Sequence, residues 1–140
     1  MLANGAKLGY TTTKPSGAST SYTDMPGLKQ IPDMGPDPEK VENTCLTDTH
    51  KMYELGIGDL PEMKYTFKYD NTSASSPYRV ARKWAEDGTL VYFKETLKDG
   101  TTTEFGAQVS VKRTGGAVNG VLEFEMTCMV QTEFKYTDPA

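Results

Sequence analysis

The sequence has little of what enzymes and metal proteins need. Its 140 residues include one histidine, His50, and two cysteines, Cys45 and Cys128. Neither cysteine has a neighbouring group that would activate its thiol, and the sequence has no nucleophile-elbow, metal-ligand or dinucleotide-binding motif. We therefore expect no catalytic residue, no metal and no cofactor, and we interpret His50 as an ordinary loop histidine.

Positive charge and long apolar runs are also lacking. The formal net charge is −4, which argues against tight binding of phosphates, although an acidic surface can serve a nucleic acid by repelling it. No run approaches the roughly 20 apolar residues of a membrane helix. The N-terminus has no basic region followed by an apolar core, so we expect no signal peptide and synthesis in a cytoplasm.

The strongest pattern is the alternation between Asn119 and Phe134. Apolar side chains occupy most even positions, and Glu123, Glu125 and Glu133 lie at odd ones. This period of two predicts a strand with one buried and one wet face, and it places Cys128 among the buried residues as a free thiol. Such a strand is much longer than the usual five or six residues. It predicts a sheet that continues beyond one copy or spans a wall.

The rest of the chain predicts a single domain, residues 1–140, made mainly of antiparallel strands. Residues 60–70, 89–97 and 101–114 alternate, and Asp99-Gly100 gives a tight turn between the last two. The period changes at 76–87, where Ser76 and Pro77 begin a helix with Trp84 as its core anchor. We expect an antiparallel β-sandwich or barrel with one α-helix packed on it.

Three segments lie outside this regular pattern. Residues 1–20 are small and polar, and predict either an arm that contacts a neighbour or a loose end. Residues 47–58 predict a long loop that lies against another surface or folds back on its own subunit. Residues 137–140 are a short tail. The side chains predicted to make contacts between copies are Leu8, Tyr10, Met52, Tyr53, Leu55 and Ile57.

Two runs in the first half carry a strand–turn–strand pattern that exits into a long loop. They are residues 26–35, PGLKQIPDMG, and residues 38–48, PEKVENTCLTD. With the single helix and the glycine-rich turn before a long last strand, this pattern resembles the major tail tube proteins of long-tailed bacteriophages. The resemblance covers residues 22–136 and departs at Asn43-Thr44-Cys45, where a more apolar strand is expected.

The resemblance implies a structural virion protein, made in the host cytoplasm, that forms hexameric rings stacked into a tail tube. It implies that the genome passes through without tight binding. It also implies tape measure, tail terminator and distal tail proteins as partners, and no membrane. Two alternatives stay open: the tube of a contractile injection or secretion machine, and a small monomeric ligand-binding β-barrel.

The bore of such a tube has two candidate linings. The first is the polar face of the last strand, where Glu123, Glu125 and Glu133 would keep DNA from binding the wall. The second is the polar face of residues 60–70, which is less acidic because Lys64 and Lys68 belong to it. On base rates, either face is equally well explained as the solvated side of a sandwich.

Overall fold

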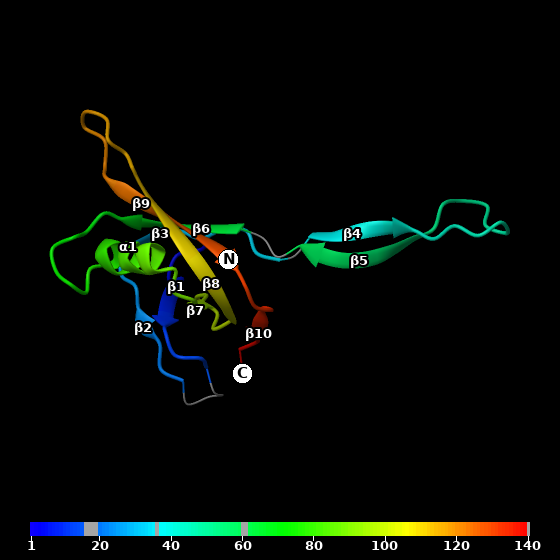
Figure 1. Cartoon of the computed structure of the whole chain (residues 1–140), viewed down its shortest axis with the longest axis horizontal. Coiled ribbons are helices and arrows are strands. Elements are labelled where there is room, and N and C mark those ends of the chain that lie inside the picture. Colours follow the sequence, from blue (N-terminus) through cyan, green and yellow to red (C-terminus); the bar gives the residue numbers. More distant parts are fainter. Residues whose placement is uncertain (16–19, 36, 60–61, 140) are drawn as a thin grey trace.

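The computed structural model describes residues 1–15, 20–35, 37–59 and 62–139, with backbone alone for residues 37–39 and 55–59. Its larger sheet has eight strands, with the order β2-β1-β7-β8-β9-β6-β3 and β10 paired to β8 (Figure 1). The strands of this sheet are β1 (Lys7–Thr11), β2 (Thr23–Asp24), β3 (Leu28–Gln30), β6 (Glu62–Lys68), β7 (Val91–Thr96), β8 (Thr102–Thr114), β9 (Glu123–Val130) and β10 (Lys135–Thr137). The helix is α1 (Pro77–Asp87), and β4 (Asp37–Glu42) with β5 (Tyr53–Asp59) forms a separate two-stranded sheet.

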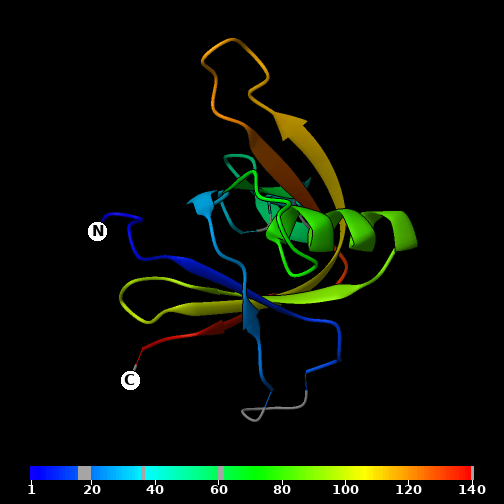
Figure 2. The same cartoon turned by 90° about the vertical axis from the view of Figure 1, so that its left-hand side faces the viewer.

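The fold class expected from the sequence is confirmed: the strands pair antiparallel and one helix covers the sheet. The sheet bends along β8, whose first half pairs with β7 and whose second half pairs with β9. Figure 2 shows the two halves of the sheet crossing, with α1 between their open ends. The concave side encloses a core that takes side chains from both halves.

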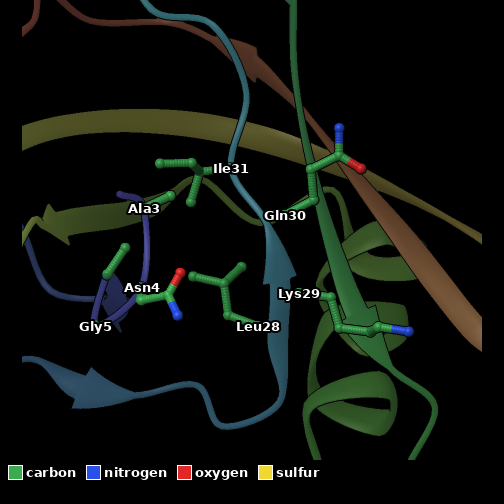
Figure 3. A pocket seen from close by; sticks show the side chains of 8 residues that line it. Ala3, Asn4, Gly5, Leu28, Lys29, Gln30 and Ile31 are labelled. Carbon is green, nitrogen blue, oxygen red and sulfur yellow. The ribbon is translucent and has the colours of Figure 1, made fainter. Parts of the chain in front are cut away.

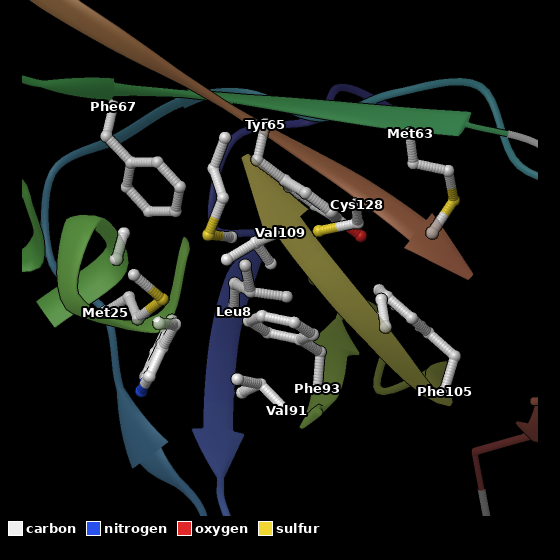
Figure 4. Packing of buried hydrophobic residues seen from close by; sticks show 14 of the residues in the cluster. Leu8, Met25, Met63, Tyr65, Phe67, Val91, Phe93, Phe105, Val109 and Cys128 are labelled. Carbon is white, nitrogen blue, oxygen red and sulfur yellow. The ribbon is translucent and has the colours of Figure 1, made fainter. Parts of the chain in front are cut away.

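Alternation determines which side chains enter this core. Phe124, Met126 and Cys128 of β9 are fully buried, and Cys128 is a free thiol as predicted. Met63, Tyr65 and Phe67 of β6 lie opposite them, and Figure 4 shows these side chains converging with those of β1, β7 and β8.

Helix α1 begins and ends where the sequence predicts. Ser76 precedes it in an extended conformation, Pro77 occupies its first turn, and Gly88 ends it in the left-handed region with φ of 67°. Trp84 is buried, with its ring edge-on to Tyr10 at 4.7 Å and to Phe93 at 6.0 Å between centroids. Trp84 is therefore the core anchor that the helical pattern predicted.

The prediction of an N-terminal arm is wrong for residues 7–11. These residues form β1, which pairs with β7 on one side and with β2 on the other. Leu8 is fully buried and points into the core (Figure 4), and Tyr10 is partly buried against Trp84. Leu8 thus has no surface to offer another copy. The polar neighbours of Leu8 hid a strand whose partner lies more than eighty residues away in the sequence.

The predicted boundaries of three other segments also change. Within residues 47–58, Tyr53 begins β5, so the loop between strands covers residues 43–52. The last long strand is shorter than predicted, since β9 covers Glu123–Val130. The predicted tail, residues 137–140, loses its first residue to β10, which pairs with β8 and places Thr137 opposite Thr102.

Candidate assembly surfaces

The convex side of β6, β9 and β8 forms one continuous polar face. Direct pairing places Lys68 and Thr114 on either side of Glu123, and Thr66 and Lys112 on either side of Glu125. The two linings that the sequence left as alternatives therefore belong to the same surface. The members of this polar face are Glu62, Lys64, Thr66, Lys68, Gln108, Ser110, Lys112, Thr114, Glu123, Glu125, Thr127 and Met129.

The polar face is mixed in charge rather than acidic. Lys29 of β3 reaches across β6, and its Nζ lies 3.4 Å from Oε2 of Glu123. Lys68 and Lys112 are the cross-strand neighbours of Glu123 and Glu125, at a spacing at which opposite charges attract. Each glutamate thus compensates a nearby lysine, which is a different role from simple repulsion of DNA.

Glu133 does not belong to this polar face. It is exposed after the end of β9, beside a hollow that Glu104 and Lys135 also line. Lys135 pairs with Glu104 near the start of β8, whereas Glu123 pairs with Thr114 at its end. Ten residues of strand span about 33 Å. The structure therefore separates Glu133 from Glu123 and Glu125, which it brings together.

Near Glu133, a second polar cluster surrounds Tyr22. The hydroxyl of Tyr22 donates to Oε1 of Glu104 at 3.0 Å, and Lys94 lies over its ring at 5.7 Å. Burial, and then the adjacent Glu104 carboxylate, raise the pKa of Tyr22 to about 12. This cluster joins the chain before β2 to β8, and it explains the conformation of that segment without any ligand.

The β4–β5 hairpin, residues 37–59, projects from the body along the longest axis of the molecule (Figure 1). Every side chain from Lys40 to Glu54 is exposed, and Leu46 is completely so. Val41, Met52 and Tyr53 are the other large apolar members of that range. Met52 and Tyr53, two of the predicted contact residues, are thus exposed on the hairpin. Leu55 and Ile57 belong to β5, and their side chains lie outside the described residues.

Local hydrogen bonds hold the loop of this hairpin. The N–H of Asn43 donates to the carbonyl of Met52 at 2.8 Å, and the N–H of Cys45 donates to Oδ2 of Asp48 at 2.7 Å. The amide of Asn43 also donates to Oε1 of Glu54 at 2.7 Å. An isolated two-stranded hairpin is marginally stable in water. The exposed apolar residues therefore indicate that another surface completes this hairpin.

Two edges of the larger sheet are open within the part of the chain that the structure describes. On β6, β3 pairs only with Thr66 and Phe67, which leaves residues 62–65 without a strand on that side. On β8, β7 pairs as far as Ala107, which leaves residues 108–114 without a strand on their other side. Unpaired edges are templates for strands of another chain.

One buried carboxylate occupies the core. Glu95 of β7 accepts a hydrogen bond of 2.6 Å from the hydroxyl of Tyr65. Burial raises the pKa of Glu95, and the bond from Tyr65 opposes that shift. Burial also raises the pKa of Tyr65, and the adjacent Glu95 carboxylate adds to that shift. Because both groups are shut inside the core, we assign them to the subunit's stability rather than to a surface.

The hollows of the molecule are open and shallow. The one in Figure 3 has a volume of about 400 Å³ and lies between residues 3–6 and the segment 28–31. Leu28 and Ile31 face Ala3 and Asn4 across it, and Lys29 points away toward the polar face (Figure 3). Among the described residues, no three His, Cys, Asp or Glu side chains gather as metal ligands. Within the same ranges, α1 is far too short and too polar to cross a bilayer.

Comparison with solved structures finds the same fold in tail assemblies. A chain in the C6-symmetric tail of an empty gene transfer agent particle is 17% identical, with 94% of each chain covered and a TM-score of 0.67. A chain in the sixfold-symmetrised baseplate of the anti-feeding prophage is 10% identical, with 95% of this chain and 92% of that chain covered and a TM-score of 0.63. A chain in the native gene transfer agent virion is 18% identical over 83% of this chain and 88% of that chain, with a TM-score of 0.62.

Sequence comparisons give the family directly. The chain matches no curated protein sequence. The model of the phage tail tube protein family matches residues 9–138, from within β1 to just after β10. The match covers the hairpin, the polar face and both open edges. This chain therefore belongs to the phage tail tube protein family.

Proposed function

We propose that six copies of this chain form a ring, that the rings stack into a tail tube, and that the genome passes through the bore. The observation that carries this proposal is the β4–β5 hairpin, which is exposed along its described side chains and rich in apolar residues. Family membership supports a tube. The sixfold symmetry of two similar tail assemblies supports the number of copies.

The hairpin has apolar side chains on both of its faces. Tyr53 pairs with Glu42, and Val41 pairs with Glu54, so Tyr53 and Val41 point to opposite sides. A single neighbouring surface would cover only one of them. The β4–β5 hairpin is therefore completed by contacts on both faces, as happens when it inserts between copies of an assembly.

The open edges explain how a ring closes. The edge of β6 at residues 62–65 in one copy pairs with the edge of β8 at residues 108–114 in the next. Such a contact joins two different patches, and repeated contacts of this kind close a ring when the rotation fits. The result is a barrel without edges, and its polar face lines the bore. Glu123 and Glu125 then face the passing DNA, with Lys29, Lys68 and Lys112 beside them.

A tube of defined length needs proteins that start, measure and close it. We include a tape measure protein, a tail terminator and distal tail proteins as partners, and we place the finished tube in the virion after synthesis in the host cytoplasm. A tube of a contractile injection machine would share the same subunit contacts. A monomeric ligand-binding barrel would not need the β4–β5 hairpin.

Removal of the hairpin tests the proposal. Asp37 pairs with Asp59, so an Asn-Gly turn can replace residues 38–58 and leave the two ends in register. We expect the parent protein to form rings and tubes in negative-stain electron microscopy. The shortened protein should keep its circular dichroism spectrum but form no tubes.

A second variant keeps the backbone of the hairpin and changes only its exposed side chains. Replacing Val41, Leu46, Met52 and Tyr53 with serine or threonine retains the backbone pairing and removes the exposed apolar area. This variant should also fail to form tubes. A parent protein that scatters light only as a 15.4 kDa species at high concentration would overturn the proposal.

A further inference from the structure

The turn between β8 and β9 carries a second exposed apolar surface. This β8–β9 tip, residues 115–122, contains no charged residue. Val118 is 93% exposed, Val121 is 64% exposed and Leu122 is 40% exposed. Single exposed apolar residues are common, but three in eight uncharged residues at the end of a projecting hairpin form a patch. The sequence predicted a glycine-rich turn at the start of this segment and assigned residues 119–122 to the last long strand.

Left-handed residues and a local hydrogen bond give the β8–β9 tip a defined turn conformation. Gly115 has φ of 84° and Asn119 has φ of 60°, and the N–H of Gly120 donates to the carbonyl of Ala117 at 2.8 Å. A side chain on Gly115 would collide with the carbonyl oxygen of Val121. A surface that is already ordered loses less entropy when it binds a partner. These features suit a preformed contact.

The β8–β9 tip and the β4–β5 hairpin leave opposite ends of the same ladder. The hairpin joins β6 before Glu62, which pairs with Met129, and the tip joins β9 before Glu123, which pairs with Lys68. Figure 1 shows the hairpin at the far right and the tip at the upper left of the molecule, and in Figure 2 the tip stands clear of the body. Each copy thus carries two different apolar projections that point away from each other.

We propose that the β8–β9 tip binds the loop of the β4–β5 hairpin, residues 43–52, of a second copy in the adjacent ring. This inference rests on the proposed function and names the partner surface that the hairpin lacks. Head-to-tail contacts require two different patches on opposite sides of each subunit. The tip and the whole β4–β5 hairpin hold seven of the eleven large apolar side chains that the structure describes as exposed, and Leu46 and Met52 are those of the loop itself. In a stack of rings, the tip of each copy covers the hairpin loop of a copy in the adjacent ring, and only the two terminal rings keep one of these surfaces exposed.

Dimensions agree with such a contact. The seven residues of β5 span about 23 Å, and the loop of residues 43–52 extends farther from the body. That reach carries Leu46 well away from the sheet of its own subunit (Figure 1). Contact with the uncharged tip buries Leu46 without leaving a charge unpaired on the tip side.

The exposed thiol of Cys45 can be used to test this contact by disulfide formation. Cys45 is exposed beside Leu46, whereas Cys128 is buried and burial raises the pKa of its thiol, which keeps it unreactive. In Val118→Cys, mild oxidation of assembled tubes should join Cys45 of one copy to the new thiol of the next. We expect ladders of covalent oligomers on non-reducing gels, and reduction should return them to the single chain.

The parent protein and two control variants isolate the contact. The parent protein reports Cys45 pairing with itself, and Val118→Cys with Cys45→Ser reports pairing between tips; both should give dimers at most. Lys98→Cys places an exposed thiol at the β7–β8 turn, at the opposite end of β8, and should give no ladder with Cys45. Tubes that form normally in Val118→Cys yet yield no ladder would overturn this inference and leave the proposed function standing. Absence of tubes in the parent protein would instead overturn the proposed function.

A charge substitution tests the contact without disulfide formation. Val118→Asp puts a charge where the structure has none, on an exposed site that does not contribute to the core. We expect rings of normal size that do not stack, because the ring edges on β6 and β8 are untouched. Normal tubes from this variant would contradict the contact.

Discussion

In the eight-stranded sheet, most large apolar side chains point inward to the core that α1 covers, whereas in the β4–β5 hairpin every described side chain from Lys40 to Glu54 is exposed. The same chain thus uses apolar residues in two ways. In the body they are buried and stabilise the subunit, whereas in the hairpin they are exposed, and we propose that they contact another copy. A change in the body should therefore alter the free energy of unfolding, and a change in the hairpin should alter assembly.

The largest contrast is expected between Trp84 and Tyr53. Trp84→Ala should lower the free energy of unfolding by about 3–5 kcal/mol, because it leaves a cavity between α1, Tyr10 and Phe93. Tyr53→Ala should change it by no more than about 0.5 kcal/mol, because the ring is exposed. Urea denaturation of the unassembled subunits measures both values. Equal losses would show that the hairpin ring packs on its own subunit.

A smaller, pH-dependent effect is expected at Glu95. Burial raises the pKa of this carboxyl, so its favourable contribution is complete below the ordinary carboxyl pKa and is lost as pH rises through the raised value. Glu95→Gln keeps an acceptor for the Tyr65 hydroxyl and carries no charge. The variant should match the parent at acidic pH and exceed it in stability near neutral pH. The measurement is a set of denaturation curves across that range.

Tyr65→Phe tests the same carboxyl by removing its hydrogen-bond donor. It removes the hydrogen bond that opposes the shift, so the pKa of Glu95 should rise further and the loss of stability should extend to higher pH. No hairpin variant should change the pH profile. If Glu95→Gln loses stability as steeply as the parent between acidic and neutral pH, Glu95 does not carry this dependence.

A small effect on folding, with a larger one on DNA retention, is expected on the polar face. Glu123→Gln with Glu125→Gln removes a partly exposed ion pair, which should cost about 0–1 kcal/mol. Assembled tubes should nevertheless retain DNA at low salt, since Lys29, Lys68 and Lys112 lose the carboxylates beside them. Retention should fall steeply as salt rises. Nuclease protection or filter binding measures it.

Glu86→Gln with Asp87→Asn, on the exposed end of α1, makes the same change in net charge away from the polar face. It should leave DNA retention unchanged. If both pairs behave alike, the polar face does not line the bore.

Local patterns predicted several elements well. Alternation identified β6, β7, β8 and the buried residues of β9, because each second side chain of a half-buried strand faces the core. Ser76, Pro77 and Gly88 bounded the helix, because caps and φ restrictions act within a few residues. These signals need no knowledge of distant partners. The same pattern put Glu123 and Glu125 on one wet face.

Distant pairing determined the rest. β1 is a short strand that is held by β7, so its five residues carried too weak a pattern to be separated from an arm. Only the register of β6 with β9 and β8 put Lys68 and Lys112 beside the glutamates and made one mixed polar face from two candidates. The open edges and the opposite directions of the hairpin and the tip likewise depend on which strands meet. The alternation of residues along a strand determines which side chains share a face. Which strands lie beside that face depends on the pairing of segments that are far apart in the sequence.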